Sequence, residues 1–106
     1  MELVQGQELL DAVMEVPGWG LEAGELVRVV TFADFVSAMA FVNRVAAAAE
    51  AANHHPDIDI RYNKVRLALV THDAGNHITQ NDLQMARTLS QLLDEDDDGT
   101  EGQRGE

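Results

Sequence analysis

Three imidazoles and the carboxylate of Glu50 lie within 23 residues of this 106-residue chain; the imidazoles belong to His54, His55 and His72. Imidazole has an unperturbed pKa of about 6.5, so it can donate or accept a proton near neutral pH. The whole chain has only four histidines, and this short stretch holds three of them. The cluster therefore predicts either an acid–base site or a ligand site.

Glu50 and His54 are four residues apart, which places them on one face of any helix that continues that far. Pro56 stops such a helix, and the carbonyl groups of a last helical turn carry partial negative charge. Both features stabilise a protonated imidazole, so we expect Glu50 to pair with His54, which then suits a general acid. His55 points about 100° further round the helix and is expected to have a different role.

Two other interpretations of the histidines stay open at this point. A His-His pair ahead of a proline is also typical of a solvated helix end. A three-histidine metal site is conceivable, although a third histidine 17 residues after the pair matches no standard zinc spacing. The absence of cysteine excludes thiolate chemistry, disulfides and cysteine-ligated zinc.

Composition limits the classes of partner. The net charge is −12 without a cluster of Lys and Arg, which argues against nucleic-acid binding. No stretch approaches the roughly 18 apolar residues needed to cross a bilayer, and the first residues do not resemble a signal peptide. The sequence therefore predicts a cytoplasmic protein with no membrane partner.

The chain length and the charge distribution predict one domain and a tail. With 45% hydrophobic residues, 106 residues are enough for one core. Residues 94–106 hold seven acids, one base and no apolar residue that could be buried, which is typical of disorder. We therefore expect a single domain over residues 1–93 and an acidic disordered tail over residues 94–106.

Hydrophobic periodicity predicts the order α-β-β-α-β-β-α. Helical spacing covers residues 6–15, 33–53 and 79–93, and strand-like patterns cover residues 19–21, 26–31, 58–62 and 65–70. Asn63-Lys64 is expected to turn the second hairpin, and Thr79 with Asp82 resembles a capping box. Short turns between neighbouring strands imply an α+β fold, with a four-stranded antiparallel sheet and three helices on one face. Strand alternation places Thr71, rather than His72, on the same face as Leu67 and Leu69. His72 therefore needs a bend at the end of the strand to join the site.

The helix expected over residues 33–53 has more apolar surface than one packed face requires. One stripe at helical spacing is predicted to face the core, formed by Phe35, Met39, Val42, Ala46 and Ala49. Its second half, residues 46–52, is alanine-rich nearly all round. We interpret that half as a helix–helix contact between subunits; the alternative is a locally exposed alanine helix.

Four motifs carry a resemblance to a known family: Glu50-x-x-x-His54-His55-Pro56, Tyr62-Asn63-x-Val65, Leu69-x-Thr71-His72 and Ile78-Thr79-x-x-Asp82. Together, over roughly residues 6–93, they resemble pterin-4a-carbinolamine dehydratase. The resemblance implies dehydration of 4a-hydroxytetrahydropterin to quinonoid dihydropterin with no metal and no organic cofactor. It also implies a functional link to an aromatic amino-acid hydroxylase, whose pterin this step recycles, and assembly into homodimers or homotetramers.

Roles for individual residues follow from the same resemblance. His54 and His72 are implied to be the catalytic acid–base pair, with Glu50 as the supporting carboxylate. Residues implied to contact or position the substrate are His55, Pro56, Thr71, Asp73 and Ala74. The loop after Ala74 is one residue longer around Asn76-His77 than the common family pattern, which could reshape the rim of the pocket.

A rival function on the same fold is a non-catalytic interaction or assembly factor, similar to a coactivator. Such a protein should lose the acid–base residues first. All three histidines and Glu50 are present here, which favours the enzyme.

Overall fold

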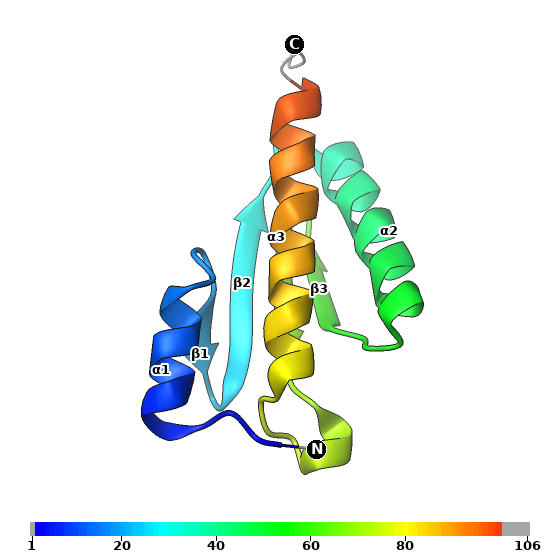
Figure 1. The fold of residues 1–106 in the computed structure, drawn as a ribbon. Coiled ribbons are helices and arrows are strands. Elements are labelled where there is room, and N and C mark those ends of the chain that lie inside the picture. The colour runs from blue at the N-terminus through cyan, green and yellow to red at the C-terminus, as the bar shows by residue number, and fades with distance from the viewer. Residues whose placement is uncertain (1, 101–106) are drawn as a thin grey trace.

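A computed structural model describes residues 2–100 of the chain, with side chains as far as Asp94. Figure 1 shows its helices and strands. In chain order the elements are α1 (Gly6–Met14), β1 (Gly20–Glu22), β2 (Glu25–Thr31), α2 (Phe35–Ala52), β3 (Asp57–Arg61), β4 (Lys64–Leu69), the short 3-10 helix η1 (His72–Ala74) and α3 (Gln80–Thr100).

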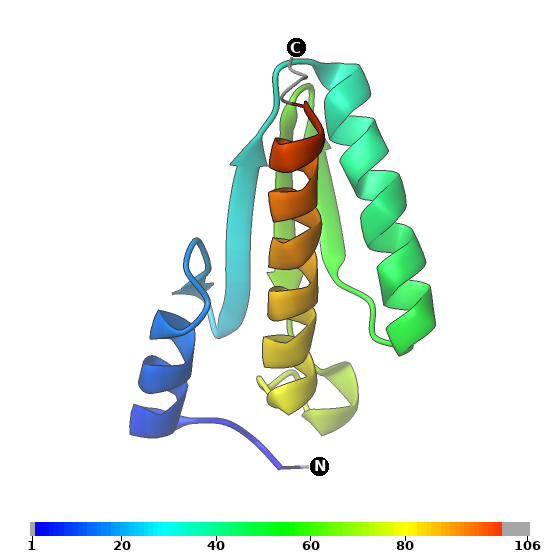
Figure 2. The same cartoon turned by 45° about the horizontal axis from the view of Figure 1, so that its top comes forward.

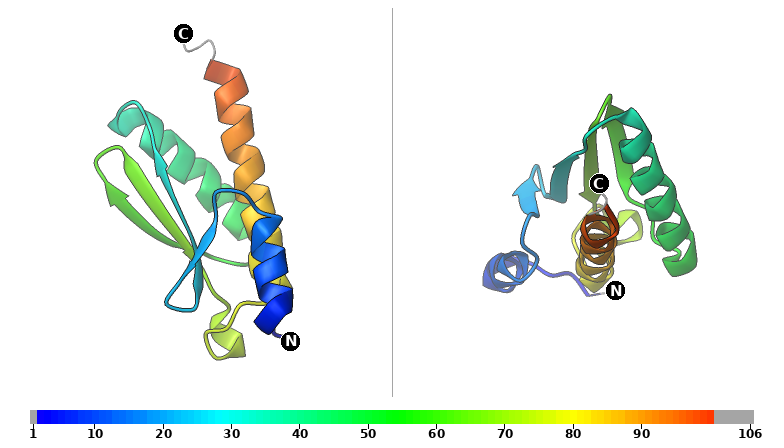
Figure 3. Two further views of the ribbon diagram at one scale, coloured as in Figure 1. Left: turned by 90° about the vertical axis from the view of Figure 1, so that its left-hand side faces the viewer. Right: turned by 90° about the horizontal axis from the view of Figure 1, so that it is seen from above.

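The strands form one antiparallel sheet in the order β1-β2-β4-β3. The helices lie on one face of this sheet, as the views in Figures 2 and 3 agree. The predicted α+β fold and its element order are therefore confirmed. The second hairpin turns at Tyr62-Asn63 rather than at the predicted Asn63-Lys64, because Arg61 pairs with Lys64 and leaves two residues between the strands.

The core lies between the sheet and the helices α2 and α3. Val65, Leu67 and Leu69 of β4 are fully buried, as alternate residues of a central strand with one covered face should be. They pack in one cluster with Phe41 of α2 and Leu89 of α3. Burial of each such side chain contributes about 1.5–3 kcal/mol, so this cluster is the main stabilising contact of the layers.

Helix α2 begins at an N-terminal cap and packs a different face from the one predicted. The Asp34 carboxylate accepts a hydrogen bond from the Ser37 backbone N–H at 2.8 Å, and the hydrogen bonds from Ser37 lower the pKa of Asp34. Of the predicted stripe, Ala49 is buried and Met39 and Val42 are half-buried, but Phe35, 48% exposed, and Ala46 face outward. The buried residues of the helix are Ala38, Phe41, Val45 and Ala49.

The wrong stripe has a simple physical cause. Apolar residues surround α2, so more than one set of positions satisfies a period of 3.6 residues. By length and composition alone, α2 could also cross a membrane, contrary to the sequence expectation. Its middle carries Asn43 and Arg44, and four of its residues pack in the core. These contacts are those of a helix belonging to the folded domain.

Helix α3 starts where the sequence predicted. The Asp82 carboxylate accepts a hydrogen bond from the Thr79 N–H at 2.9 Å, and the Thr79 hydroxyl accepts one from the Asn81 N–H at 3.2 Å. This is a capping arrangement, and it satisfies two of the N–H groups that a helix start leaves free. The helix runs to Thr100, and residues 101–106 lie outside the described part of the chain. The division into a domain over 1–93 and an acidic tail over 94–106 stays a prediction.

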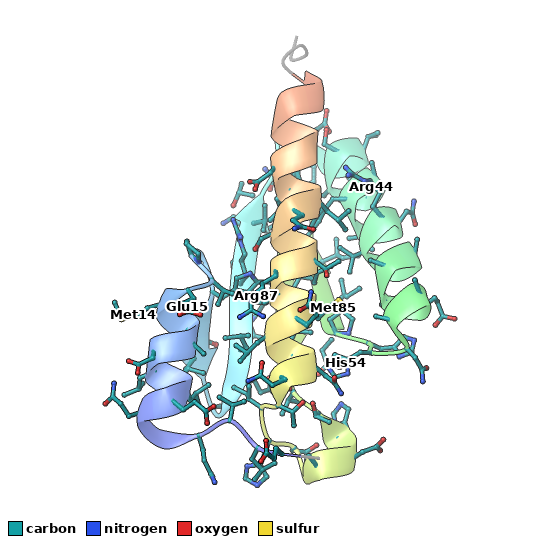
Figure 4. All side chains as sticks on the ribbon, in the orientation of Figure 1. Met14, Glu15, Arg44, His54, Met85 and Arg87 are labelled. Carbon is teal, nitrogen blue, oxygen red and sulfur yellow. The ribbon has the colours of Figure 1, made fainter. Side chains whose placement is uncertain are left out.

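The amino-terminal elements attach to the flank of α3. The Trp19 indole N–H donates to the Ser90 hydroxyl of α3 at 3.0 Å. Arg87 lies 4.0 Å from Glu15 at the end of α1, an exposed pair that contributes at most about 1 kcal/mol. Figure 4 shows this pair bridging α1 and α3. This flank lies away from the histidines, so α1 is not expected to contribute to their chemistry.

Candidate active site

The end of α2 places the His-His pair. Asn53 caps the helix in the left-handed conformation, with φ of 52°, which asparagine tolerates better than most residues. The backbone N–H of His54 donates to the carbonyl of Ala49 at 3.1 Å, which closes the last turn. His54 and His55 therefore follow directly on a fixed helix end, and β3 begins two residues later at Asp57.

His54 contacts a buried carboxylate from α3. Its Nε2 lies 2.6 Å from Oδ1 of Asp82, and the His54 side chain is only 15% exposed. Asp82 is 0% exposed, and its other oxygen, Oδ2, accepts from the hydroxyl of Thr71 at 2.7 Å and from the N–H of Thr79. Because a carboxylate only accepts hydrogen bonds, the ring must donate from Nε2. The ring nitrogen left for another partner is Nδ1.

Tertiary structure makes this contact, and Figure 4 shows His54 beside α3 just beyond the end of α2. The two residues are 28 positions apart in sequence. Asp82 was recognised in the sequence as a helix-capping residue, and its second contact was missed. No rule of sequence spacing predicts the contact between Asp82 and His54, because that contact depends on how α2 and α3 pack together.

Glu50 pairs with His55, and the predicted pairing with His54 was wrong. Oε2 of Glu50 lies 2.6 Å from Nε2 of His55, and both side chains are exposed. The prediction assumed that the helix continues through His54. Because Asn53 turns the backbone into the left-handed region, the four-residue spacing no longer describes a shared helix face.

The other wall of the site follows β4. Thr71 is buried, and its hydroxyl lies 2.8 Å from the hydroxyl of Thr79 in addition to its bond to Asp82. His72 then starts the 3-10 helix η1, which supplies the bend that the sequence required. The Nδ1 atom of His72 lies 2.7 Å from Oδ1 of Asn76. Asp82 therefore ties the two walls together, through His54 on one side and Thr71 on the other.

These residues surround a pocket of about 170 Å³. A cavity of about 150 Å³ can hold a benzene molecule, so this pocket admits a small ring system. Its lining residues are Asn53, His54, His55, Val70, Thr71, His72 and Asp73.

The structure thus gathers five of the eight predicted site residues around one pocket: His54, His55, Thr71, His72 and Asp73. Glu50, Pro56 and Ala74 lie outside the lining, although Glu50 reaches it through His55. Asn53 and Val70 line the pocket and were not predicted. Asn53 gave only the signal of a helix end, and Val70 only that of a strand residue.

Among the side chains that the structure describes, which end at Asp94, no group of three or more His, Asp or Glu is arranged to hold a metal ion. The three site histidines instead have separate partners. These are a buried carboxylate for His54, an exposed carboxylate for His55 and an amide for His72. Such an arrangement fixes three rings around one space, where each can exchange protons with a bound molecule.

Comparisons with known proteins agree with this geometry. Residues 2–92 match the family model described as pterin 4 alpha carbinolamine dehydratase. A protein of Acidobacterium capsulatum, named provisionally as a pterin-4-alpha-carbinolamine dehydratase, is 59% identical over 83 residues, which cover 78% of this chain and 89% of that protein. A similarly named protein of Nostoc is 45% identical over 91 residues, covering 86% of this chain and 97% of the relative.

Two solved structures have the same fold. A transcriptional coactivator/pterin dehydratase from Brucella melitensis superposes with a TM-score of 0.80 at 30% identity, over 86% of this chain and 98% of that one. A pterin dehydratase-like protein described as a RuBisCO assembly factor of the alpha-carboxysome gives 0.57 at 19% identity, over 70% and 84%. At that identity the second likeness shows the fold alone.

Proposed function

We propose that this chain, which belongs to the pterin 4 alpha carbinolamine dehydratase family, removes water from a 4a-hydroxytetrahydropterin to give quinonoid dihydropterin. The observation that carries the proposal is the pocket with three imidazoles, one of them held by a fully buried carboxylate. A cytoplasmic location and a role in recycling the pterin of an aromatic amino-acid hydroxylase belong to the same proposal.

The reaction needs a proton donor for the departing hydroxyl and a proton acceptor for N5 of the same substrate. Hydroxide is a poor leaving group, so the C4a–O bond breaks as the hydroxyl takes a proton and departs as water. The N5 lone pair forms the double bond to C4a, and N5 then loses its proton. General acid–base catalysis of this kind contributes about 10²–10⁴-fold.

The partners of the two histidines suit these two tasks. His54 donates from Nε2 to Asp82, which leaves Nδ1 of a protonated ring as the donor to the substrate, and the carboxylate balances the charge of that ring. We assign His54 as the acid that protonates the hydroxyl. His72 has a neutral amide partner, and we assign it as the base that accepts the N5 proton.

The remaining residues are proposed to position the substrate. His55, oriented by Glu50, is an exposed residue of the pocket lining, and Thr71 and Asp73 line the same pocket. Pro56 and Ala74 do not line the pocket, so we propose that they act by shaping the segments after His55 and His72. In this proposal Glu50 supports catalysis through His55 rather than through His54.

The test is direct measurement of dehydration. A working aromatic amino-acid hydroxylase generates 4a-hydroxytetrahydropterin, and absorbance follows its decay with and without this protein. We expect the decay rate to rise in proportion to the concentration of added protein. Decay no faster than with an equal mass of an unrelated protein would contradict the proposed function.

A second candidate function, that of an assembly or coactivator factor, has one observation in its favour. The outer face of α2 presents Phe35, 48% exposed, and Val36, 75% exposed. Exposed apolar surface of this kind is typical of an interaction site. The intact histidine pocket favours the dehydratase as the main function. We propose that this face binds further copies of the same chain, giving a homodimer or homotetramer.

The proposed subunit contact predicts the effect of a charge on α2. Ala47 is an exposed residue of its alanine-rich half. In an Ala47→Glu variant the subunit contact would bury an unpaired carboxylate, at a cost of several kcal/mol. We expect the wild type to sediment as a dimer or tetramer and Ala47→Glu as a smaller species. The matched control is Gln84→Glu on the exposed side of α3, and an Ala47→Glu assembly of unchanged size would refute this contact.

A further inference from the structure

The loop that follows η1 makes one polar side-chain contact to the site. Asn76 Oδ1 lies 2.7 Å from Nδ1 of His72. This loop is the segment that is one residue longer than the common family pattern. We propose that Asn76 is a positioning residue, which fixes His72 with its proton on Nδ1 and so leaves Nε2 to exchange protons with the substrate. The catalytic part of this inference rests on the proposed function, whereas the assignment of the proton does not.

The backbone holds Asn76 in place. Gly75 and Asn76 are both left-handed, with φ of 75° and 64°, so the chain turns back over η1. The turn is closed by hydrogen bonds from the Asn76 N–H to the Thr71 carbonyl at 3.1 Å and from the Thr71 N–H to the His77 carbonyl at 2.9 Å. Ile78, buried just beyond, anchors the end of the loop. The amide is therefore presented to His72 by a folded turn.

The chemistry of the two groups fixes where the proton lies. The amide oxygen of Asn76 can only accept a hydrogen bond, so Nδ1 of His72 must donate. In a neutral imidazole the other nitrogen, Nε2, then carries the lone pair. The opposite orientation of the amide would present an N–H to the ring and would require the lone pair on Nδ1. The tautomer of His72 therefore reports directly on this contact.

The two catalytic rings consequently offer opposite nitrogens to the pocket. His54 is bound at Nε2 by Asp82 and keeps Nδ1 available, whereas His72 is bound at Nδ1 by Asn76 and keeps Nε2 available. An amide also orients the ring without adding negative charge beside it. This suits a base, because a neighbouring carboxylate would favour the protonated ring before the substrate has supplied its proton.

Two variants separate the contact from the shape of the loop. Asn76→Gly removes the acceptor and keeps a residue for which φ of 64° is unstrained. Asn76→Asp keeps an oxygen acceptor at a position that aspartate tolerates. The matched control is His77→Ala, since His77 holds the loop through its backbone carbonyl.

The first readout is the ¹⁵N spectrum of the imidazoles in the ligand-free protein, with the His72 signals identified by their loss in His72→Ala. We expect the Nδ1–H tautomer in the wild type, in Asn76→Asp and in His77→Ala, and loss of that preference in Asn76→Gly. An Nε2–H tautomer in the wild type, or an unchanged Nδ1–H tautomer in Asn76→Gly, would overturn the inference.

The second readout is steady-state dehydration by the same proteins. We expect kcat to fall about 10- to 100-fold in Asn76→Gly, by analogy with the range for groups that orient metal-binding histidines, with KM little changed. Full kcat in an Asn76→Gly variant that has lost the tautomer would overturn the positioning role. A wild type without dehydratase activity would refute the proposed function instead, and the tautomer measurement would still decide whether Asn76 orients His72.

Discussion

Replacement of His54 by glutamine is expected to lower kcat for dehydration by about 10²- to 10⁴-fold, the range for loss of one general acid. A glutamine amide N–H can still donate to Asp82, so the buried carboxylate keeps a partner and the fold should persist. The amide cannot transfer a proton to the departing hydroxyl. KM should change much less than kcat, because the lost interaction acts on the transition state. Single-turnover absorbance measurements of the wild type and the variant would give the comparison.

The control for this experiment is His77→Ala, which removes an exposed imidazole whose ring does not line the pocket. Its kcat should equal that of the wild type. A His54→Gln variant with wild-type kcat would show that the acid is another group, while the dehydratase activity itself would remain established. The His72→Gln variant tests whether His72 transfers both protons. Loss of activity in His72→Gln, with wild-type activity in His54→Gln, would assign both proton transfers to His72.

Replacement of Asp82 by alanine should have the largest effect on stability. The carboxylate is fully buried and has three hydrogen-bonding partners, so its removal leaves Thr71, the Thr79 N–H and His54 without their acceptor. Leaving a buried donor without its acceptor costs about 1–3 kcal/mol, so the loss of these bonds should remove a large fraction of the roughly 5–15 kcal/mol that stabilises an average protein. Urea unfolding followed by circular dichroism measures this loss.

Asp57→Ala is the matched control, since it removes an exposed carboxylate from the start of β3. It should change the free energy of unfolding by no more than about 0.5 kcal/mol. Asp82→Asn should lose less stability than Asp82→Ala, because an amide oxygen still accepts. An Asp82→Ala variant as stable as Asp57→Ala would mean that the network contributes nothing to folding.

The start of α3 shows what sequence can predict well. Thr79 and Asp82 are three residues apart, and the arrangement that they form depends only on the local backbone. Strand β4 was predicted for a similar reason, since alternation at Val65, Leu67 and Leu69 records one buried face. Local sequence rules were sufficient where one buried face or the first turn of a helix determines the structure.

Two of the failures arise from tertiary packing and one from the local backbone at Asn53. A helix that is apolar nearly all round does not indicate which face meets the sheet, so the packed stripe of α2 was misplaced. The partner of His54 was misassigned because a left-handed residue at Asn53 breaks the helical spacing. Asp82 was assigned to a cap only, because its contact with His54 exists once α2 and α3 have packed.

The double use of Asp82 affects how relatives of this protein should be compared. The carboxylate caps α3 and joins two walls of the fold, so a lineage that abandons dehydration would still be under selection to keep it for folding. His55 and His72 are exposed, and their loss would cost the fold little. Retention of Asp82 in a distant homologue therefore says little about activity. Under the proposed function, retention of His55 and His72 is the sign that selection for dehydration has continued.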